Sequence, residues 1–286
     1  MLLSPGTELG RYRLQEKIGA GGMAEVWRAD DLTLERPVAV KLLTEQISLD
    51  PTFAKRFFRE AKVTARLEHP NILPVYDFGE HAGLLYIVMQ LVTGGTLRER
   101  ARKGTDLPTA MSWIRSLASA LDFAHAEGVV HRDVKPANVL LDRSGRPLLA
   151  DFGLAKPRDA EVLTVAGTAM GTPVYMSPEA LRGEELTPRS DQYSLGVLAY
   201  YLLTGQPPFE ANSMFVVMTK TLYEEPGLPT GLKRELHRSV DYVLLKVLEK
   251  EPAERFESCG EFAEALIHAA ERSLPPPSGS RSGAYR

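Results

Sequence analysis

The chain has 286 residues, of which 44% are hydrophobic and 25% are charged, a composition typical of a soluble globular protein with a large core. Its 34 basic and 37 acidic residues leave a net charge of -3, which argues against nucleic acid or an anionic membrane surface as a partner. The single cysteine, Cys259, excludes an internal disulfide and a cysteine-based metal cage. The N-terminal residues lack the pattern of a signal peptide, and the most apolar run, 193–203, is too short to cross a bilayer. We therefore expect a soluble, cytoplasmic protein.

Residues 11 to 92 are predicted to form mainly β-strands. Apolar residues alternate, or nearly so, along two stretches, at Tyr12, Leu14 and Ile18 and at Val38, Val40 and Leu42. The run LLYIVMQLV (84–92) is continuously apolar, as in a strand that is covered on both faces. One helix interrupts these strands: Asp50 can cap it, Pro51 suits its first turn, and HPN (69–71) ends it. Its apolar stripe has a spacing of four residues, at Phe53, Phe57, Ala61 and Ala65.

From about residue 94 the pattern becomes helical. Gly128 closes a helix whose apolar face is formed by Ile114, Leu117, Ala118 and Leu121. The segment 190–205 begins with Ser190 as a cap and is apolar nearly all round after Ser194, which is typical of a buried helix. Two more helical patterns follow, at about 233–249 and 259–272.

This order of elements predicts an α+β fold with two lobes and a cleft between them. The smaller lobe, about 11–92, is rich in strands and holds one key helix, and the larger lobe, about 93–272, is mainly helical. Residues 273–286 are rich in Pro, Ser and Gly and are predicted to be a flexible tail or linker.

A glycine-rich stretch, GAGGMAEV (19–26), joins two predicted strands. Glycines allow backbone amides to approach a phosphate without a Cβ in the way. Alone this is a weak indication, because glycine hairpins are common. A Rossmann loop is excluded since a strand rather than a helix follows, and a Walker A loop is excluded since Gly-Lys-Ser/Thr is absent.

Lys41 and Glu60 are the next candidates. A lysine in the middle of a strand is usually solvent-facing, but Glu60 lies three residues after Phe57 and therefore on or beside the apolar stripe of its helix. A carboxylate there is costly unless it is paired. Lys41 is the nearest partner by element order, so the sequence predicts a Lys41–Glu60 ion pair beside the glycine loop.

The segment HRDVKPAN (131–138) places Asp133, Lys135 and Asn138 on one loop. This loop is either an ordinary solvated turn or a site that binds a hydroxyl proton, a phosphate and a metal together. ADFG (150–153) follows two apolar leucines and is by itself an ordinary turn. Beside Asn138, Asp151 becomes a candidate Mg²⁺ ligand, because Mg²⁺ prefers a few oxygen ligands in addition to substrate phosphates.

Taken together and in this order, the motifs closely resemble the signature set of protein kinases. The set comprises GAGGMAEV, VAVK, Glu60, HRDVKPAN, DFG and SPE (177–179), and the resemblance covers residues 11 to about 272. Lys135, two residues after Asp133, is typical of serine/threonine kinases. The segments GAGGMAEVWRA, YMSPE and KEPAERF are most similar to those of the eukaryotic-like (Hanks-type) serine/threonine kinases of bacteria.

The resemblance implies a role for each matching residue. It makes Asp133, Lys135, Lys41 and Glu60 the catalytic group, with Asp133 receiving or orienting the substrate hydroxyl proton and Glu60 orienting Lys41. Asn138 and Asp151 are the implied ligands of Mg²⁺, with Mn²⁺ as an alternative. ATP is expected to contact Ile18, Gly19, Ala20, Gly21, Gly22, Met23, Ala24, Val26, Ala39, Lys41, Met89, Gln90, Val92 and Leu140.

The resemblance extends to substrate docking and regulation. GTPVYMSPE (171–179) is similar to the docking segment of serine/threonine kinases, with Thr172 expected to contact the catalytic loop and Glu179 to pair with Arg255. Asp191 matches the residue that braces that loop. Arg132 precedes Asp133 and is expected to receive a phosphate placed by autophosphorylation on Thr164, Thr168 or both. Two positions depart from the family pattern, Ala24 for a glycine and Gln90 for a glutamate, and neither removes a catalytic group.

The expected activity is ATP-dependent phosphorylation of serine or threonine in proteins, including the kinase itself, in bacterial signalling. Protein substrates and a kinase homodimer for autophosphorylation are the expected partners. The chain is expected to be cytoplasmic, or the cytoplasmic domain of a membrane-anchored kinase. Two alternatives are a pseudokinase that acts as a scaffold or nucleotide-binding module and a kinase that acts on small molecules. A pseudokinase scaffold would lack γ-phosphate transfer, and a small-molecule kinase would lack a segment like GTPVYMSPE.

Overall fold

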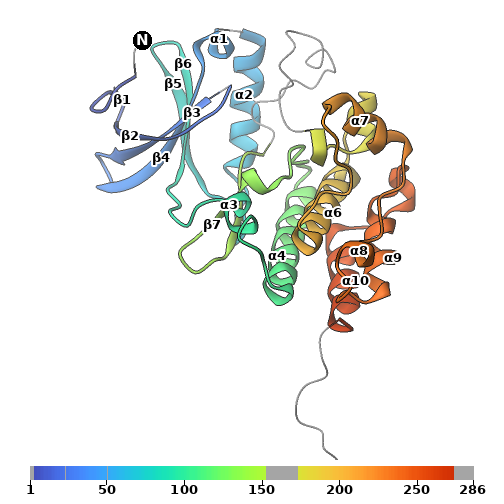
Figure 1. The fold of residues 1–286 in the computed structure, drawn as a ribbon. Helices are drawn as coiled ribbons and strands as arrows, with labels where there is room; N and C mark the ends of the chain where they lie inside the picture. The colour runs from blue at the N-terminus through green and yellow to red at the C-terminus, as the bar shows by residue number, and fades with distance from the viewer. Residues whose placement is uncertain (1–2, 23, 50, 153–172, 274–286) are drawn as a thin grey trace, which may run out of the picture.

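The computed structural model describes residues 3–22, 24–49, 51–152 and 173–273. The smaller lobe is built on one antiparallel sheet whose strand order is β1-β2-β3-β4-β6-β5. Its strands are β1 (Glu8–Leu9), β2 (Tyr12–Ala20), β3 (Ala24–Asp31), β4 (Arg36–Leu43), β5 (Val75–His81) and β6 (Leu84–Gln90). Figure 1 shows the sheet curling at one end of the molecule, with helix α2 (Pro51–Thr64) beside it.

The alternation of side chains gives the sheet two buried faces. Tyr12, Trp27 and Val40 pack in a cluster on one face. On the other face Phe53, Phe57 and Ala61 of α2 pack against sheet residues that include Leu43 and Ile87. The short helix α1 (Glu45–Ser48) leads into α2. The predicted apolar stripe is therefore the surface that fixes α2, and with it Glu60, to the sheet.

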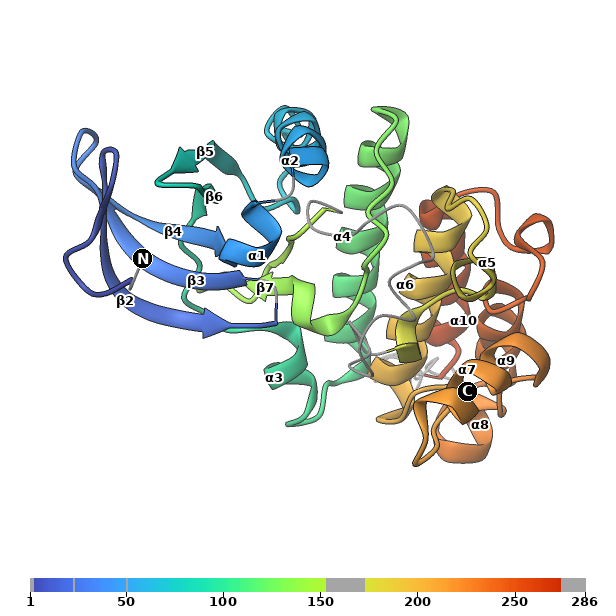
Figure 2. The same cartoon turned by 90° about the horizontal axis from the view of Figure 1, so that it is seen from above.

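The larger lobe is mainly helical, and Figure 2 shows most of its helices on the side of β7 that faces away from the six-stranded sheet. Its helices are α3 (Leu97–Ala101), α4 (Leu107–Ala126), α5 (Pro178–Arg182), α6 (Pro188–Thr204), α7 (Met214–Tyr223), α8 (Pro229–Leu232), α9 (Arg238–Val247) and α10 (Cys259–Glu271). The ribbon consists of β7 (Val139–Leu141) paired with β8 (Pro147–Leu149). Single 3-10 turns occur at Pro136–Asn138, Pro173–Tyr175 and Pro252–Glu254. In the described part of the chain, no helix has both the length and the apolar character needed to span a membrane.

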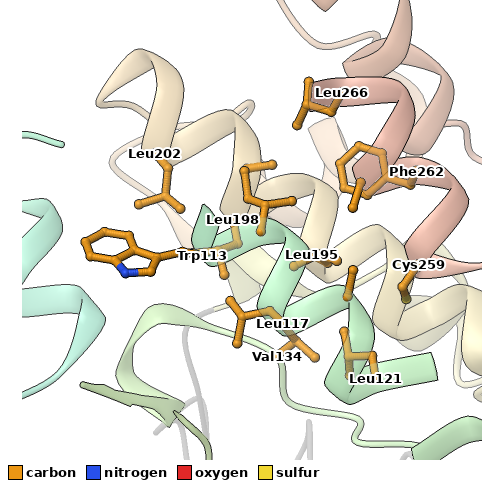
Figure 3. Packing of buried hydrophobic residues seen from close by; sticks show 14 of the residues in the cluster. Trp113, Leu117, Leu121, Val134, Leu195, Leu198, Leu202, Cys259, Phe262 and Leu266 are labelled. Atoms are coloured by element: carbon orange, nitrogen blue, oxygen red, sulfur yellow. The ribbon is translucent and has the colours of Figure 1, made fainter. Parts of the chain in front are cut away.

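The core of this lobe lies where α4, α6 and α10 meet. Figure 3 shows Leu117 of α4, Leu195 of α6 and Phe262 of α10 in one packed cluster. All three side chains are fully buried. Gly196 allows close packing here, because a Cβ at that position would lie 2.5 Å from Cγ1 of Val247.

The predicted α+β fold with two lobes is confirmed, and two helix starts differ from the prediction. Helix α6 begins at Pro188 rather than at Ser190, because Thr187 is its N-terminal cap. The backbone amide of Thr187 donates a hydrogen bond to Ser190 Oγ at 3.1 Å. Helix α9 begins at Arg238 rather than near residue 233. Leu236 packs against the core, so the apolar pattern of α9 begins before the helix itself. The backbone directly before His237 is not helical. The predicted boundary near residue 92 lies between β6 and α3, and residues 274–286 lie outside the described residues.

Candidate active site

An apolar pocket lies between the sheet and the β7–β8 ribbon. Ala39 and Met89 of the sheet pack in one cluster with Leu73, Leu148 and Ala150. Val26, Leu91, Val92 and Leu140 are partly buried against the same cluster. Five residues that the sequence assigned to ATP are thus brought together here, namely Val26, Ala39, Met89, Val92 and Leu140. The pocket beside this cluster is lined by Met89, Leu73 and Ala150 together with Lys41, Thr64, Ile87 and Phe152.

The backbone that leads into this pocket is exposed at the glycine loop. Ile18 at the end of β2 is 47% exposed, and Gly21 N donates a hydrogen bond to Ala24 O at 2.9 Å across the turn. A Cβ added at Gly22 would meet no atom within 4 Å, so the glycine leaves open space above the loop. Gly19 and Ala20 end β2, and Met23 lies outside the described residues.

The segment 131–138 forms a compact polar loop between α4 and β7. Lys135 Nζ lies 2.7 Å from Asp133 Oδ2. The side-chain amide of Asn138 donates to the backbone oxygen and to Oδ2 of Asp133, both at 2.9 Å. These bonds use the amide hydrogens of Asn138 and present its carbonyl oxygen to other partners. The loop therefore collects an acid, an ammonium and an amide oxygen, as the sequence predicted.

Asp191 of helix α6 fixes the backbone at the start of this loop. Its carboxylate accepts hydrogen bonds from the backbone amides of His131 and Arg132, each at 2.7 Å, and lies 2.8 Å from Nε2 of His125. Arg132 has a positive φ of 67°, a conformation that a side chain adopts at a cost. The buried carboxylate compensates for that cost by satisfying two adjacent amides, which confirms the predicted bracing position of Asp191.

His131 links the loop to the strand that carries Asp151. Its Nδ1 accepts a hydrogen bond from the Asp133 amide at 3.2 Å, and its Nε2 lies 2.9 Å from Ala150 O. Both contacts fit a neutral ring with its proton on Nε2. Burial lowers the pKa of His131, although the negative charge of Asp191 opposes that shift. The ring also packs on Phe152 at a centroid distance of 4.5 Å. Sequence reasoning did not assign this histidine, although it is the first residue of the HRDVKPAN motif.

The charged groups from the smaller lobe are paired differently from the prediction. Lys41 Nζ lies 2.7 Å from Oδ1 of Asp151, and Glu60 Oε1 lies 3.6 Å from the Arg132 guanidinium. Among the described residues, these two contacts stand in place of the predicted Lys41–Glu60 ion pair. Element order identified one suitable carboxylate for Lys41, but Asp151 at the end of β8 competes for the same ammonium.

Glu179 and Arg255 form a buried ion pair beneath the docking segment. The guanidinium makes two parallel bonds to the carboxylate, at 2.8 and 2.9 Å, and both side chains are less than 4% exposed. Burial would raise the pKa of Glu179, but the hydrogen bonds and charge of Arg255 hold it below its usual value. Arg255 also bonds the backbone oxygens of Arg189, Glu249 and Lys250. The predicted pair is therefore confirmed.

Besides Met23, three sequence-assigned residues belong to segments that the structure does not describe, and one further contact was missed. Thr164, Thr168 and Thr172 lie outside the described residues. Ser194 of α6 donates to the backbone oxygen of Tyr175 at 2.7 Å and ties the docking segment to the core. The signal available in the sequence was a serine directly before the apolar part of this helix.

The model of the protein kinase domain matches residues 12–269. The serine/threonine-protein kinase PknH of Mycobacterium tuberculosis is 39% identical over 266 residues, which cover 92% of this chain and 42% of that protein. The probable serine/threonine-protein kinase SCO3848 of Streptomyces coelicolor is 43% identical over 260 residues, or 88% of this chain and 39% of that protein.

Solved structures show the same relationship. The crystal structure of the PknI kinase domain of Mycobacterium tuberculosis superposes with a TM-score of 0.79 and 34% identity, covering 94% of this chain and all of that one. The chain spans less than half the length of the curated relatives that it matches. Kinase domains of this family use ATP and a divalent metal and act on proteins. The family match, the fold and the arrangement of the polar loop agree, and the chain belongs to the protein kinase domain family as a serine/threonine kinase domain of the bacterial type.

Proposed function

We propose that the chain is a catalytically active kinase that transfers the terminal phosphate of ATP to serine or threonine hydroxyls of proteins, itself included. The observation that carries this proposal is the polar loop, in which Asp133, Lys135 and Asn138 are held together at the apolar pocket. Phosphoryl transfer depends mainly on positioning and on charge neutralisation, and this loop offers groups for both.

Asp133 is assigned the role of orienting the substrate hydroxyl and receiving its proton. Lys135 Nζ, 2.7 Å from that carboxylate, adds positive charge near the transferred phosphate. The hydrogen bonds from Asn138 fix the direction of the carboxylate. A general base of this kind contributes about 100- to 10,000-fold to a rate.

The nucleotide is assigned to the apolar pocket and the glycine loop. Val26, Ala39 and Leu140 would enclose the base, with Met89 at the back of the pocket. The Gln90 amide already donates to Pro74 O at 3.1 Å, so its carbonyl and the backbone of Leu91 and Val92 are the groups left for the base. Lys41 and the exposed amides of the glycine loop would contact the phosphates, because the loop has open space above it.

Asn138 and Asp151 are assigned as ligands of a divalent cation, Mg²⁺ or alternatively Mn²⁺. The donor set fits a hard cation, since it combines a carboxylate with an amide oxygen, and the contacts of Asn138 to Asp133 turn that oxygen away from the loop. A cation bound there would neutralise negative charge on the phosphate oxygens. The two ligands come from adjacent backbone, because Ala150 N donates to Asn138 O at 2.8 Å.

We assign the observed ion pairs to a less active arrangement. Arg132 holds Glu60 at 3.6 Å, and Lys41 lies on Asp151 rather than on Glu60. A phosphate on Thr164 or Thr168 would bind the Arg132 guanidinium more strongly than a single carboxylate does. Glu60 would then be available to orient Lys41, and Asp151 to bind the cation. Thr172 is assigned a structural hydroxyl in the docking segment.

A transfer assay tests the proposed activity. The protein is incubated with ATP labelled at the γ-phosphate, Mg²⁺ and peptides that differ only in carrying serine, threonine or tyrosine. Label is expected on the serine and threonine peptides, and EDTA is expected to abolish it. Binding of a fluorescent ATP analogue without any transfer would overturn the proposal in favour of a pseudokinase scaffold.

The proposed regulation and partners are tested separately. Mass spectrometry of the purified chain is expected to find phosphate on Thr164, Thr168 or both, and the double alanine variant to be less active. Loop phosphate in the Asp133→Asn protein made without another kinase would contradict autophosphorylation. Because autophosphorylation between copies is second order, its rate per molecule should rise with protein concentration if a homodimer forms. A cytoplasmic location and the absence of nucleic acid as a partner are proposed from the sequence.

A further inference from the structure

A β-bulge separates the glycine loop from the rest of the sheet. Strand β2 pairs with β3 at Lys17, which lies opposite Trp27, and the register then shifts by one residue. Pairing resumes with Gly19 opposite Val26, so Ile18 is the extra residue. An extra residue interrupts the ladder of hydrogen bonds and bends the strand. The bulge is therefore the place where the loop can change its angle relative to the sheet.

Glu25 connects the two sides of this bulge. It is the second residue of β3 and lies opposite Ala20, on the loop side. Its Oε1 lies 2.7 Å from Nζ of Lys17, which is on the sheet side. Its Oε2 accepts a hydrogen bond from Nε1 of Trp27, also on the sheet side, at 3.1 Å. The three side chains form a cluster that spans the bulge, the Lys17–Glu25–Trp27 cluster.

This cluster is anchored in the core on one side and open to solvent on the other. Trp27 is buried and packs with Tyr12 and Val40, which fixes the position of its Nε1. Glu25 and Lys17 are 33% and 44% exposed. The hydrogen bond from Lys17 is the main reason that the pKa of Glu25 lies below its usual value, although burial opposes that shift. A partly exposed pair of this kind contributes modestly, so the expected effect of removing it is a few-fold.

The cluster lies on the opposite face of the sheet from the nucleotide pocket. Side chains alternate along β3, so Val26 points away from its neighbours Glu25 and Trp27. Val26 packs against the pocket cluster that contains Ala39 and Met89. The turn itself is closed directly before Glu25 by a hydrogen bond that ends at Ala24 O. The cluster can therefore fix the angle of the turn without occupying the space that a nucleotide needs.

We propose that Glu25 is a positioning residue that holds the glycine loop over the nucleotide phosphates by tying it to Lys17 and Trp27 across the bulge. This inference rests on the proposed kinase activity. Glu25 faces away from the pocket and acts only through the backbone of residues 19–22. Without this tie the loop opens more often, so the nucleotide leaves faster, whereas transfer in the closed site proceeds as before.

The test separates KM from kcat. Glu25→Gln removes the charge and keeps an oxygen that can accept from Trp27. The KM for ATP is expected to rise about three- to fivefold while kcat stays within about twofold. The dissociation rate of a fluorescent ATP analogue, measured by stopped flow, should rise by the same factor. Lys17→Met should act alike, and the double variant should show no larger effect, because both changes remove one ion pair.

The matched control is Glu16→Gln. Glu16 pairs with Arg28 across the same two strands, but both residues lie on the sheet side of the bulge. This variant is expected to leave the KM for ATP and the dissociation rate unchanged, although its loss of stability in urea should be as small as that of Glu25→Gln. A purely structural role for Glu25 would not separate the two variants.

An unchanged KM and dissociation rate in Glu25→Gln, or an equal rise in Glu16→Gln, would overturn the inference. If the wild-type protein binds the analogue but transfers no phosphate, the proposed activity fails, and the dissociation rates still decide the role of Glu25. If the wild-type protein binds no nucleotide, both the proposed activity and this inference fail.

Discussion

The two lobes contribute to one site but hold their charged groups in different ways. In the larger lobe, Asp133 and Asn138 sit on a loop whose backbone is bonded to the buried Asp191 and His131. In the smaller lobe, the Lys41 ammonium contacts Asp151 and the Glu60 carboxylate contacts Arg132, and the two side chains are 16% and 24% exposed. Buried hydrogen bonds fix one geometry, whereas a partly exposed ion pair exchanges partners at little cost. We therefore interpret the loop 131–138 as preset and the charged groups of the smaller lobe as able to change partners.

The largest effect is expected at Asp133, on the loop 131–138 of the larger lobe. Asp133→Asn keeps the shape and the contact with Asn138 but removes the charge and the proton acceptor. Phosphate transfer is expected to fall about 100- to 10,000-fold, while affinity for a fluorescent ATP analogue changes little. Turnover within tenfold of the wild-type value would contradict the role of Asp133.

The buried ion pair beneath the docking segment is the next largest expected effect, on stability. Glu179→Gln leaves the Arg255 guanidinium buried without its charge partner, and the free energy of unfolding should fall by about 3–5 kcal/mol. The matched control is Glu264→Gln, which removes an exposed partner of Arg115 and should cost about 0.5 kcal/mol. Both are measured by urea unfolding. Similar losses in the two variants would mean that burial does not distinguish these pairs.

The contribution of the smaller lobe is tested by substitutions of Lys41 and Glu60. Lys41→Met removes the proposed phosphate contact and is expected to lower transfer about 100- to 1,000-fold. Glu60→Gln only weakens the positioning of Lys41, so its effect should be smaller, at most about 100-fold. In the double variant the two losses should not add, because both act through one ammonium. Full additivity of the two losses would exclude a shared role.

The smallest expected effect concerns pH and His131. Because burial lowers its pKa, the folded protein holds the ring neutral while the unfolded chain titrates near about 6.5. The unfolded state therefore binds more protons below that pH, and stability should decrease as pH falls from 7.5 to 5.5, by about 1 kcal/mol from this group. Urea unfolding of the wild-type and His131→Gln proteins at both values isolates the contribution. An equal pH dependence in the two proteins would exclude it.

Sequence reasoning predicted what is local and missed what depends on competition. The glycine loop, the polar loop and the two-lobed order follow from contiguous motifs and periodicity. The pairing of Glu179 with Arg255 was available only through the family resemblance, since 76 residues separate them. The partner of Lys41 could not be predicted, because Asp151 and Glu60 both suit an ammonium and only the folded distances select one.

One structure would test the central claim most directly, namely that the larger lobe is preset and the smaller lobe changes partners. The loop-phosphorylated protein is crystallised with Mg²⁺ and a non-hydrolysable ATP analogue, and the Lys41 Nζ to Glu60 carboxylate distance is measured. The account predicts that this distance falls below 4 Å, that Arg132 leaves Glu60, and that the bonds of Asp191 to the loop amides stay unchanged. A complex in which Glu60 remains on Arg132, or in which the Asp191 bonds rearrange instead, would contradict it.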